Sequence, residues 1–317
     1  MECVFERNLY HKKNTILSLT TKPCDKPNNA IFINDNHRPE RSPVNYTVCI
    51  CGPTKYNYSD YQRVIEWMEL NRILGAGRTI IYNVDTSRLV QSVFNYYRRR
   101  GELEVYNVNP PYIYGDQRWI KGKHEDPAYA KMSMRHDCIM REMFKTRYVV
   151  FLDLDENIVP RISDDYTWDD MIKSTGCEND DYIMAGNVHF RRNWGVDYMV
   201  KKDPEISFTY RLLTLMTTYR DEMFFPPMTR SKYMVKPETV AAASTHRAFL
   251  IGGLKQPCLL RTHIGALHHY KYRNNHINDT ESVRDRTMFK YRDLLLENVA
   301  RAYRDLRKDL ELFDIFV

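Results

Sequence analysis

An apolar stretch that ends in acidic residues is the most informative pattern in the chain. Residues 148–152 are apolar and strand-forming, and Asp153, Asp155 and Glu156 follow them directly. The run predicts a buried strand, and charge there is tolerated where it is paired, metal-bound or at an exposed strand end. Asp153 and Asp155 point to the same side of an extended chain, and two oxygen ligands so placed suit Mn²⁺ or Mg²⁺. A solvated acidic turn is the alternative, because Asp-x-Asp alone is a weak motif.

Upstream of this stretch, apolar strands alternate with amphipathic helices. Strands are predicted at 46–51, 78–82, 103–108 and 148–152, and helices between Ser59 and Gly75, between Ser87 and Gly101, and at about 127–145. Ser59 and Gln62 form a capping-box pattern at the start of the first helix. Crossovers of this length imply parallel strands in right-handed units, so the sequence predicts the nucleotide-binding half of a doubly wound, mostly parallel α/β sheet. The sequence contains neither a G-x-G-x-x-G pattern nor a P-loop, which argues against NAD, FAD and P-loop nucleotide sites.

The rest of the chain divides less sharply. We expect residues 1–43 to be a small extended or β appendage, incomplete at its start, and residues 44–317 to form the main domain. Within that domain, 44–160 are the expected nucleotide-binding half, 161–273 a loop-rich acceptor half and 274–317 a C-terminal helical region. Further strands are predicted at 181–190, 233–237 and 258–261, and a long helix from 282 to about 307.

Composition and charge narrow the classes of function. The net charge of +6 is spread along the chain without a basic block, so a nucleic-acid partner is not expected. No apolar stretch reaches the roughly 20 residues of a membrane span, and the N-terminus lacks the apolar core of a signal peptide. Asn45, Asn57 and Asn278 fit the N-glycosylation pattern, which indicates a secretory location. The 7 cysteines lack zinc spacing; an odd number leaves at least one thiol unpaired within the chain, and their pairing cannot be deduced.

A series of short motifs resembles one enzyme family. The motifs lie, in order, at 64–69 with 74–75, 82–83 with Ser87, 137–138, 151–156, 231–237 with His246, and 268–271. Together they make the chain similar to glycosyltransferase family 92 over roughly residues 44–273. The resemblance implies a GT-A fold and inverting, Mn²⁺-dependent transfer of galactose from UDP-galactose in the Golgi lumen. It also implies a type II membrane protein, whose N-terminal anchor is absent from this sequence, and the turn after Tyr82 departs from the Asp-Asn of the family.

The resemblance also assigns site residues. It places Asp153, Asp155 and His269 at the metal, with His269 preferred over His268 and with Mg²⁺ as the alternative to Mn²⁺. The expected donor-binding residues are Asn83, Asp85, Asp137, Asp153, Asp155 and His246. Glu66, which shares a helix face with Glu69, is expected in a structural or acceptor-side role.

Inverting transfer sets a requirement for one further residue. A general base must remove the proton of the acceptor hydroxyl, whereas the metal offsets the charge on the departing UDP, so no general acid is needed. Asp197 and Glu205, in the aromatic-rich half, are the candidate bases. The sequence thus predicts a metal-dependent hexosyltransferase acting on a glycan. A catalytically inactive glycan-binding or scaffolding protein of the same fold is the alternative. A nucleotidyltransferase is a third hypothesis, against which the missing glycine-rich nucleotide loop argues.

Overall fold

The protein consists of two compact units, Met1–Arg41 and Ser42–Val317. The computed structural model describes residues 44–51, 58–108, 128–253, 255–272, 282–307 and 309, together with 16–18, 20, 22, 26 and 29–32 of the first unit. In that first unit, β1 (Ile16–Leu17) pairs antiparallel with β2 (Ile31–Phe32). Two of the predicted glycosylation sites, Asn57 and Asn278, lie outside the described residues.

The second unit is built on a seven-stranded sheet with the order β14-β8-β11-β6-β3-β4-β5. Its strands are β3 (Val44–Ile50), β4 (Arg78–Asn83), β5 (Leu103–Asn107), β6 (Thr146–Phe151), β8 (Tyr182–Ala185), β11 (Lys232–Val235) and β14 (Cys258–Leu259). All neighbouring pairs are parallel except those of β11, which runs antiparallel to β6 and β8. Strands β5, β4, β3 and β6 are neighbours in that order, so the first strand of the sheet along the chain, β3, lies between the second and the fourth. This is the strand order of doubly wound folds. The predicted mostly parallel α/β sheet is confirmed.

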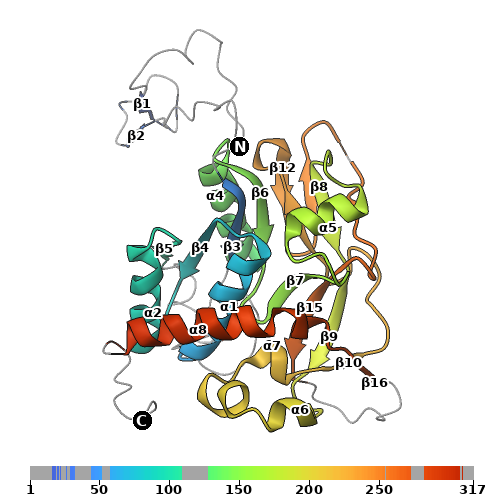
Figure 1. The fold of residues 1–317 in the computed structure, drawn as a ribbon. Coiled ribbons are helices and arrows are strands. Elements are labelled where there is room, and N and C mark those ends of the chain that lie inside the picture. Colours follow the sequence, from blue (N-terminus) through green and yellow to red (C-terminus); the bar gives the residue numbers. More distant parts are fainter. Residues whose placement is uncertain are drawn as a thin grey trace, which may run out of the picture. The chain divides into compact units, whose positions relative to one another are not determined.

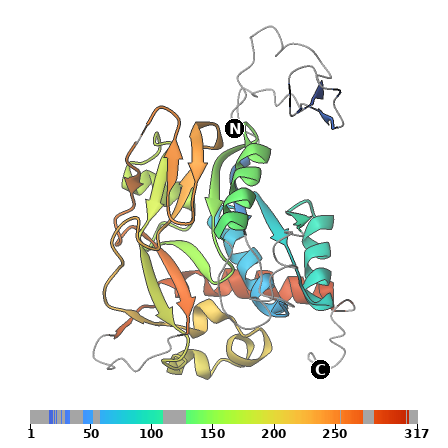
Figure 2. The same ribbon diagram turned by 180° about the vertical axis from the view of Figure 1, so that it is seen from behind.

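Helices cover both faces of this sheet. Helices α1 (Tyr61–Leu74), α2 (Arg88–Arg99) and α8 (Arg292–Leu306) lie on one face and α4 (Ala128–Glu142) on the other (Figure 1). Figure 2 shows α4 from behind, against β6. Residues of β3 alternate between the two layers, because successive strand side chains point to opposite faces. Val48 packs in the α1 layer, whereas Cys49 packs in the α4 layer.

The helix ends follow local signals with one exception. Ser87 caps α2 by accepting a hydrogen bond from Val90 N, and Gly75 ends α1 with φ of 115°, a conformation that glycine adopts without strain. The prediction of a capping box at Ser59 and Gln62 is wrong, because the residue that caps α1 is Asp60, which accepts a hydrogen bond from Arg63 N at 3.0 Å.

A second sheet of five strands has the order β16-β10-β9-β15-β7. Its strands are β7 (Glu156–Pro160), β9 (Asn187–Arg191), β10 (Tyr219–Asp221), β15 (Gly265–Lys271) and β16 (Ser282–Arg284). The single strand predicted at 181–190 is wrong, because the chain passes from β8 to β9, and so from one sheet to the other, at Gly186. The helix predicted from 282 begins only at Arg292, because residues 282–284 pair with β10.

Short elements complete the second unit. These are α5 (Trp168–Thr175), α6 (Tyr198–Lys201), a π-helical turn (Glu205–Thr209), α7 (Leu213–Met216), 3₁₀ turns (Pro237–Thr239 and Thr287–Tyr291), and the paired strands β12 (Val240–Ala243) and β13 (Ala248–Leu250). Within the described ranges, every helix is too short or too polar to cross a bilayer.

Two disulfides connect distant parts of this unit. Cys49 of β3 is bonded to Cys138 of α4, and Cys177, just after α5, is bonded to Cys258 of β14. Cys51 is buried with a free thiol. The sequence allowed disulfides but did not reveal these pairs.

Candidate functional site

The acidic residues lie where the two sheets meet. Strand β6 of the seven-stranded sheet ends at Phe151, and β7 of the five-stranded sheet begins at Glu156. Residues 152–155 form the turn between them. Strand β15 runs antiparallel to β7, and its register places His269 opposite Glu156. The backbone N–H of Tyr270 also donates to the carbonyl of Asp155 at 2.8 Å. Sheet pairing thus brings His269 to the acidic turn across more than one hundred residues of chain.

Asp155 and His269 form the most accessible polar pair at this turn. The Nε2 atom of His269 lies 3.2 Å from Oδ2 of Asp155, whose side chain is 43% exposed. The other ring nitrogen, Nδ1, lies 3.4 Å from Oε1 of Glu156 and 3.3 Å from Nδ2 of Asn187. Burial alone would raise the pKa of Asp155, but the hydrogen bond and charge of His269 outweigh it and lower the pKa. The Asp155 carboxylate is therefore kept ionised and faces solvent.

Asp153 has a different partner. Because β11 runs antiparallel to β6, its first residue, Lys232, lies beside the end of β6. The Lys232 ammonium lies 2.8 Å from Asp153 and 3.0 Å from Glu156, and only 2% of its side chain is exposed. Burial alone would lower the pKa of Lys232, but the charges of the two carboxylates outweigh burial and raise it. Burial alone would raise the pKa of Asp153, but the charge and hydrogen bond of Lys232 outweigh burial and lower it. Sequence reasoning missed the role of Lys232, although a lysine that opens an apolar strand was a usable signal.

The donor atoms at the turn suit a divalent cation. Carboxylate oxygen with one imidazole nitrogen is a set that Mn²⁺ accepts, and Mg²⁺ prefers oxygen alone. Asp155 and His269 already converge at 3.2 Å, whereas Asp153 is bonded to Lys232 at 2.8 Å. Elsewhere in the described chain, Cys177, Asp180 and Cys258 cluster, but a disulfide uses both of those sulfur atoms.

The expected donor-binding residues are spread along the same edge of the sheet. Asn83 ends β4, where its amide donates to Asn107 Oδ1 at 2.9 Å and its own buried Oδ1 lacks a hydrogen bond in the described structure. Asp85 follows, and its carbonyl accepts from Tyr58 N. His246 Nδ1 lies 3.1 Å from the carbonyl of Ser231, the residue before Lys232, and burial lowers the pKa of His246.

Asp137 lies on α4 and is already engaged. It accepts hydrogen bonds from the Tyr82 hydroxyl at 2.5 Å and from Arg141 Nε at 2.6 Å. Because Tyr82 is the residue before Asn83 on β4, the bond ties Asp137 to the end of that strand.

The two candidate bases have contrasting surroundings. The Asp197 side chain is inaccessible to solvent, accepts paired hydrogen bonds from Arg284 and Arg286 at 2.8–3.0 Å and caps α6. Hydrogen bonds, first from Arg286 and also from Arg284, lower its pKa despite burial. These contacts give Asp197 a structural role and make it a poor proton acceptor. Glu205 is exposed at the start of the π-helical turn.

Glu66 is also held by several groups. Its carboxylate accepts hydrogen bonds from Arg63, from the backbone N–H groups of Leu213 and Thr214, and from the Thr214 hydroxyl. It therefore anchors α7 to α1, which is a structural role.

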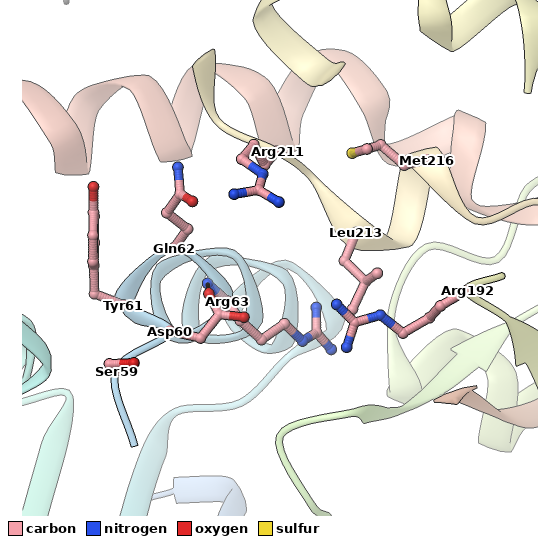
Figure 3. Close-up of a pocket in the computed structure, with 9 residues that line it drawn as sticks. All are labelled: Ser59, Asp60, Tyr61, Gln62, Arg63, Arg192, Arg211, Leu213 and Met216. Carbon is pink, nitrogen blue, oxygen red and sulfur yellow. Dashed lines mark hydrogen bonds between the residues drawn. The ribbon is translucent and has the colours of Figure 1, made fainter. Parts of the chain in front are cut away.

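A pocket of about 290 Å³ opens beside the acidic turn (Figure 3). Its lining residues are Ser59, Asp60, Tyr61, Gln62, Arg63, Arg192, Arg211, Leu213 and Met216. Arg63 connects the pocket to the turn, because its Nε donates to the carbonyl of Leu154 at 2.6 Å.

Comparisons with known proteins show which family the chain belongs to. The chain is 24% identical to "Beta-1,4-galactosyltransferase galt-1" of Caenorhabditis elegans over an alignment of 204 residues. The alignment covers 63% of this chain and 42% of that protein. Among solved structures, the crystal structure of S. aureus TarS matches 50% of this chain and 24% of TarS, with 14% identity and a TM-score of 0.28. The chain therefore spans less than half the length of either protein. The model of glycosyltransferase family 92 matches residues 44–310, and the chain belongs to that family.

Proposed function

We propose that the protein is a metal-dependent, inverting glycosyltransferase with a GT-A-type fold, which moves a hexose from a UDP-sugar to a glycan acceptor. Family membership implies a sugar donor and an acceptor. The observation that carries the proposal is the Asp155–His269 pair, which the fold assembles at the carboxyl edge of a doubly wound sheet. Ligands bind at that edge in open α/β sheets.

The proposed cofactor is Mn²⁺, with Mg²⁺ as the alternative. Asp155 and His269 would hold it directly, and Asp153, oriented by Lys232, would contact it through water or bind the ribose of the donor. When bound, the metal would offset the charge on the departing diphosphate. Lys232 keeps Asp153 and Glu156 in a fixed orientation, so the acidic turn needs little rearrangement to bind.

The proposed donor is UDP-galactose. The name of the galt-1 relative supports galactose, and Asn83, Asp85, Asp137 and His246 are the proposed contacts around the nucleotide. The orphaned Oδ1 of Asn83 is an acceptor that a ribose hydroxyl could satisfy.

Glu205 is the better candidate for the general base. This residue is exposed, whereas Asp197 would first have to release Arg284 and Arg286. Its proposed role is to take the proton of the acceptor hydroxyl as that oxygen attacks the anomeric carbon.

The proposed location is the Golgi lumen, which is typical of the family. Two disulfides suit an oxidising compartment. Asn45, one of the glycosylation motifs, is exposed at the start of β3.

A donor panel tests the proposal. Purified protein is incubated with UDP-galactose, UDP-glucose and UDP-N-acetylglucosamine, with Mn²⁺ or EDTA and a mixture of glycan acceptors. We expect UDP release that is highest with UDP-galactose and abolished by EDTA. Binding of UDP without release from any donor would favour the alternative, an inactive glycan-binding protein.

A further inference from the structure

The pocket beside the acidic turn carries an excess of positive charge. Three arginines, Arg63, Arg192 and Arg211, line it against one carboxylate, Asp60. In Figure 3 their guanidinium groups turn toward the space between α1 and residues 211–216. Asp60 caps α1, and its one negative charge offsets only part of the positive charge.

Arg63 has its hydrogen bonds committed to the protein. Its guanidinium donates to the Leu154 carbonyl, to Glu66 and to Asn157 at 2.6–3.1 Å, and only 5% of the side chain is exposed. Arg63 is therefore a fixed part of the pocket wall, and because Glu66 balances its charge, the positive charge offered to a ligand comes from Arg192 and Arg211.

Arg192 and Arg211 are available for a ligand. Within the described parts of the chain, neither guanidinium forms a hydrogen bond or an ion pair. The backbone N–H of Arg192 donates to the Lys271 carbonyl at 3.0 Å, and its guanidinium stacks 4.4 Å from the centre of the Tyr272 ring. Arg192 is thus positioned by the end of β15, the strand that carries His269.

Arg211 is held in an unusual backbone conformation. Its φ is 51°, in the left-handed region that residues other than glycine seldom occupy and that is frequent at binding sites. The flanking backbone is fixed, because Leu212 N donates to the Ile206 carbonyl and Leu213 N donates to Glu66. Its side chain therefore leaves a rigid segment at the pocket.

Two contacts connect the pocket to the proposed donor and metal site. Arg63 Nε donates to the Leu154 carbonyl of the acidic turn at 2.6 Å. Tyr58, which precedes the lining residue Ser59, donates its backbone N–H to the Asp85 carbonyl at 3.4 Å. Arg192 follows β9 and Arg211 precedes α7, so both come from parts of the chain after β7.

We propose that this pocket binds a negatively charged group, a carboxylate or a sulfate, on a sugar of the acceptor glycan. Arginine forks match the planar or tetrahedral oxygens of such groups. A volume of about 290 Å³ is near the lower end of small-molecule pockets, roughly 300–1,000 Å³, and suits a single sugar unit. The role as an acceptor subsite rests on the proposed transfer function.

Binding of matched saccharides tests this inference. The dissociation constants of methyl glucuronide and methyl glucoside, and of galactose 6-sulfate and galactose, are measured by calorimetry or NMR titration without donor or metal. Wild-type protein is expected to bind each acidic sugar about tenfold or more tightly than its neutral counterpart, and added salt should reduce the difference. The double variant Arg192→Gln/Arg211→Gln should bring the ratio of the neutral and acidic dissociation constants close to one. The control variant Arg261→Gln changes an exposed arginine outside the pocket and should leave this ratio unchanged. Arg63 is left intact because its loss would disturb the fold.

Three results would overturn the inference: equal affinities in the wild type, a preference that survives in the double variant, or tenfold weaker UDP binding in the double variant with an unchanged saccharide preference. The last result would assign the pocket to the donor diphosphate. Failure of the saccharide-binding test can be distinguished from failure of the UDP-release assay. A preference for acidic sugars without UDP release from any donor would remove the proposed function and leave the anion-binding site in place.

Discussion

At the scale of single residues, the three carboxylates of the acidic turn have different tasks because they have different partners. Asp155 is paired with His269 and faces solvent, Asp153 is paired with Lys232, and Glu156 is buried between Lys232 and His269. Burial raises the pKa of Glu156, whereas their partners lower the pKa of Asp153 and Asp155 against burial. Because Glu156 is buried, the two aspartates are the carboxylates that can meet a cation.

Replacement of Asp155 tests the metal assignment. Asp155→Asn keeps the shape of the side chain and removes its charge, so Mn²⁺-dependent binding of UDP should weaken at least tenfold, with little change in thermal stability. Calorimetric titration of UDP with and without Mn²⁺ measures this. Asp293→Asn, at an exposed position on α8, is the control. Unchanged UDP affinity in a folded Asp155→Asn protein would show that the metal is held elsewhere.

Replacement of Lys232 tests its positioning role. Lys232→Met leaves Asp153 and Glu156 without their buried cation, which should cost roughly 3–5 kcal/mol of unfolding free energy. Lys232→Met/Glu156→Gln should recover part of this loss, because it removes one of the two unpaired charges. Urea unfolding of Lys232→Met, Glu156→Gln, the double variant and the wild type measures the coupling. Additive losses would mean that Lys232 and Glu156 do not interact.

These residues also show what the sequence could and could not reveal. The acidic turn was visible because its charges interrupt an apolar run, and the family resemblance pointed to His269. Lys232 and the arginines that hold Asp197 were not visible as partners, because they lie 79 to 89 residues away along the chain. Only the pairing of β11 with β6, and of β16 with β10, brings these side chains together.

At the scale of elements, periodicity predicted the first four strands and their helices well, because each has one clear pattern and a local stop signal. The errors fell where tertiary pairing overrides pattern. The apolar run at 181–190 is continuous in sequence, yet its two halves form strands in different sheets. The polar start of the last predicted helix became β16 because β10 offers it a partner.

Asp197 joins two of these elements, and its replacement distinguishes structure from catalysis. It connects the start of α6 to Arg284 of β16 and to Arg286. Asp197→Asn keeps the α6 cap but leaves the two arginines without a charged partner, so the melting temperature should fall. Transfer activity measured well below that temperature should change little. A general base would behave in the opposite way, with activity lost and stability retained, as we expect for Glu205→Gln.

At the scale of the whole molecule, two covalent bonds link parts that sequence separates. Cys49–Cys138 fastens α4 to the central strand β3, and Cys177–Cys258 fastens the segment after α5 to the edge strand β14. The first bond involves the residue after Asp137 on α4, and the second lies at the β14 edge of the sheet. The sequence separations are 89 and 81 residues, so each closes a long loop in the unfolded chain.

The disulfides give a prediction for stability and for the compartment of folding. Closing a loop of this length lowers the entropy of the unfolded chain and typically contributes about 2–4 kcal/mol. Cys177→Ser/Cys258→Ser should therefore lower the melting temperature by roughly 5–10 °C. Reductant should lower it further by breaking Cys49–Cys138, and the wild type in reductant should show both losses. Alkylation of the unreduced protein in denaturant, followed by peptide mass mapping, checks the pairing directly. These four cysteines should resist labelling there, whereas the buried free thiol of Cys51 should react. If the four are labelled in protein made through the secretory route, the bonds do not form and this support for a luminal enzyme is removed.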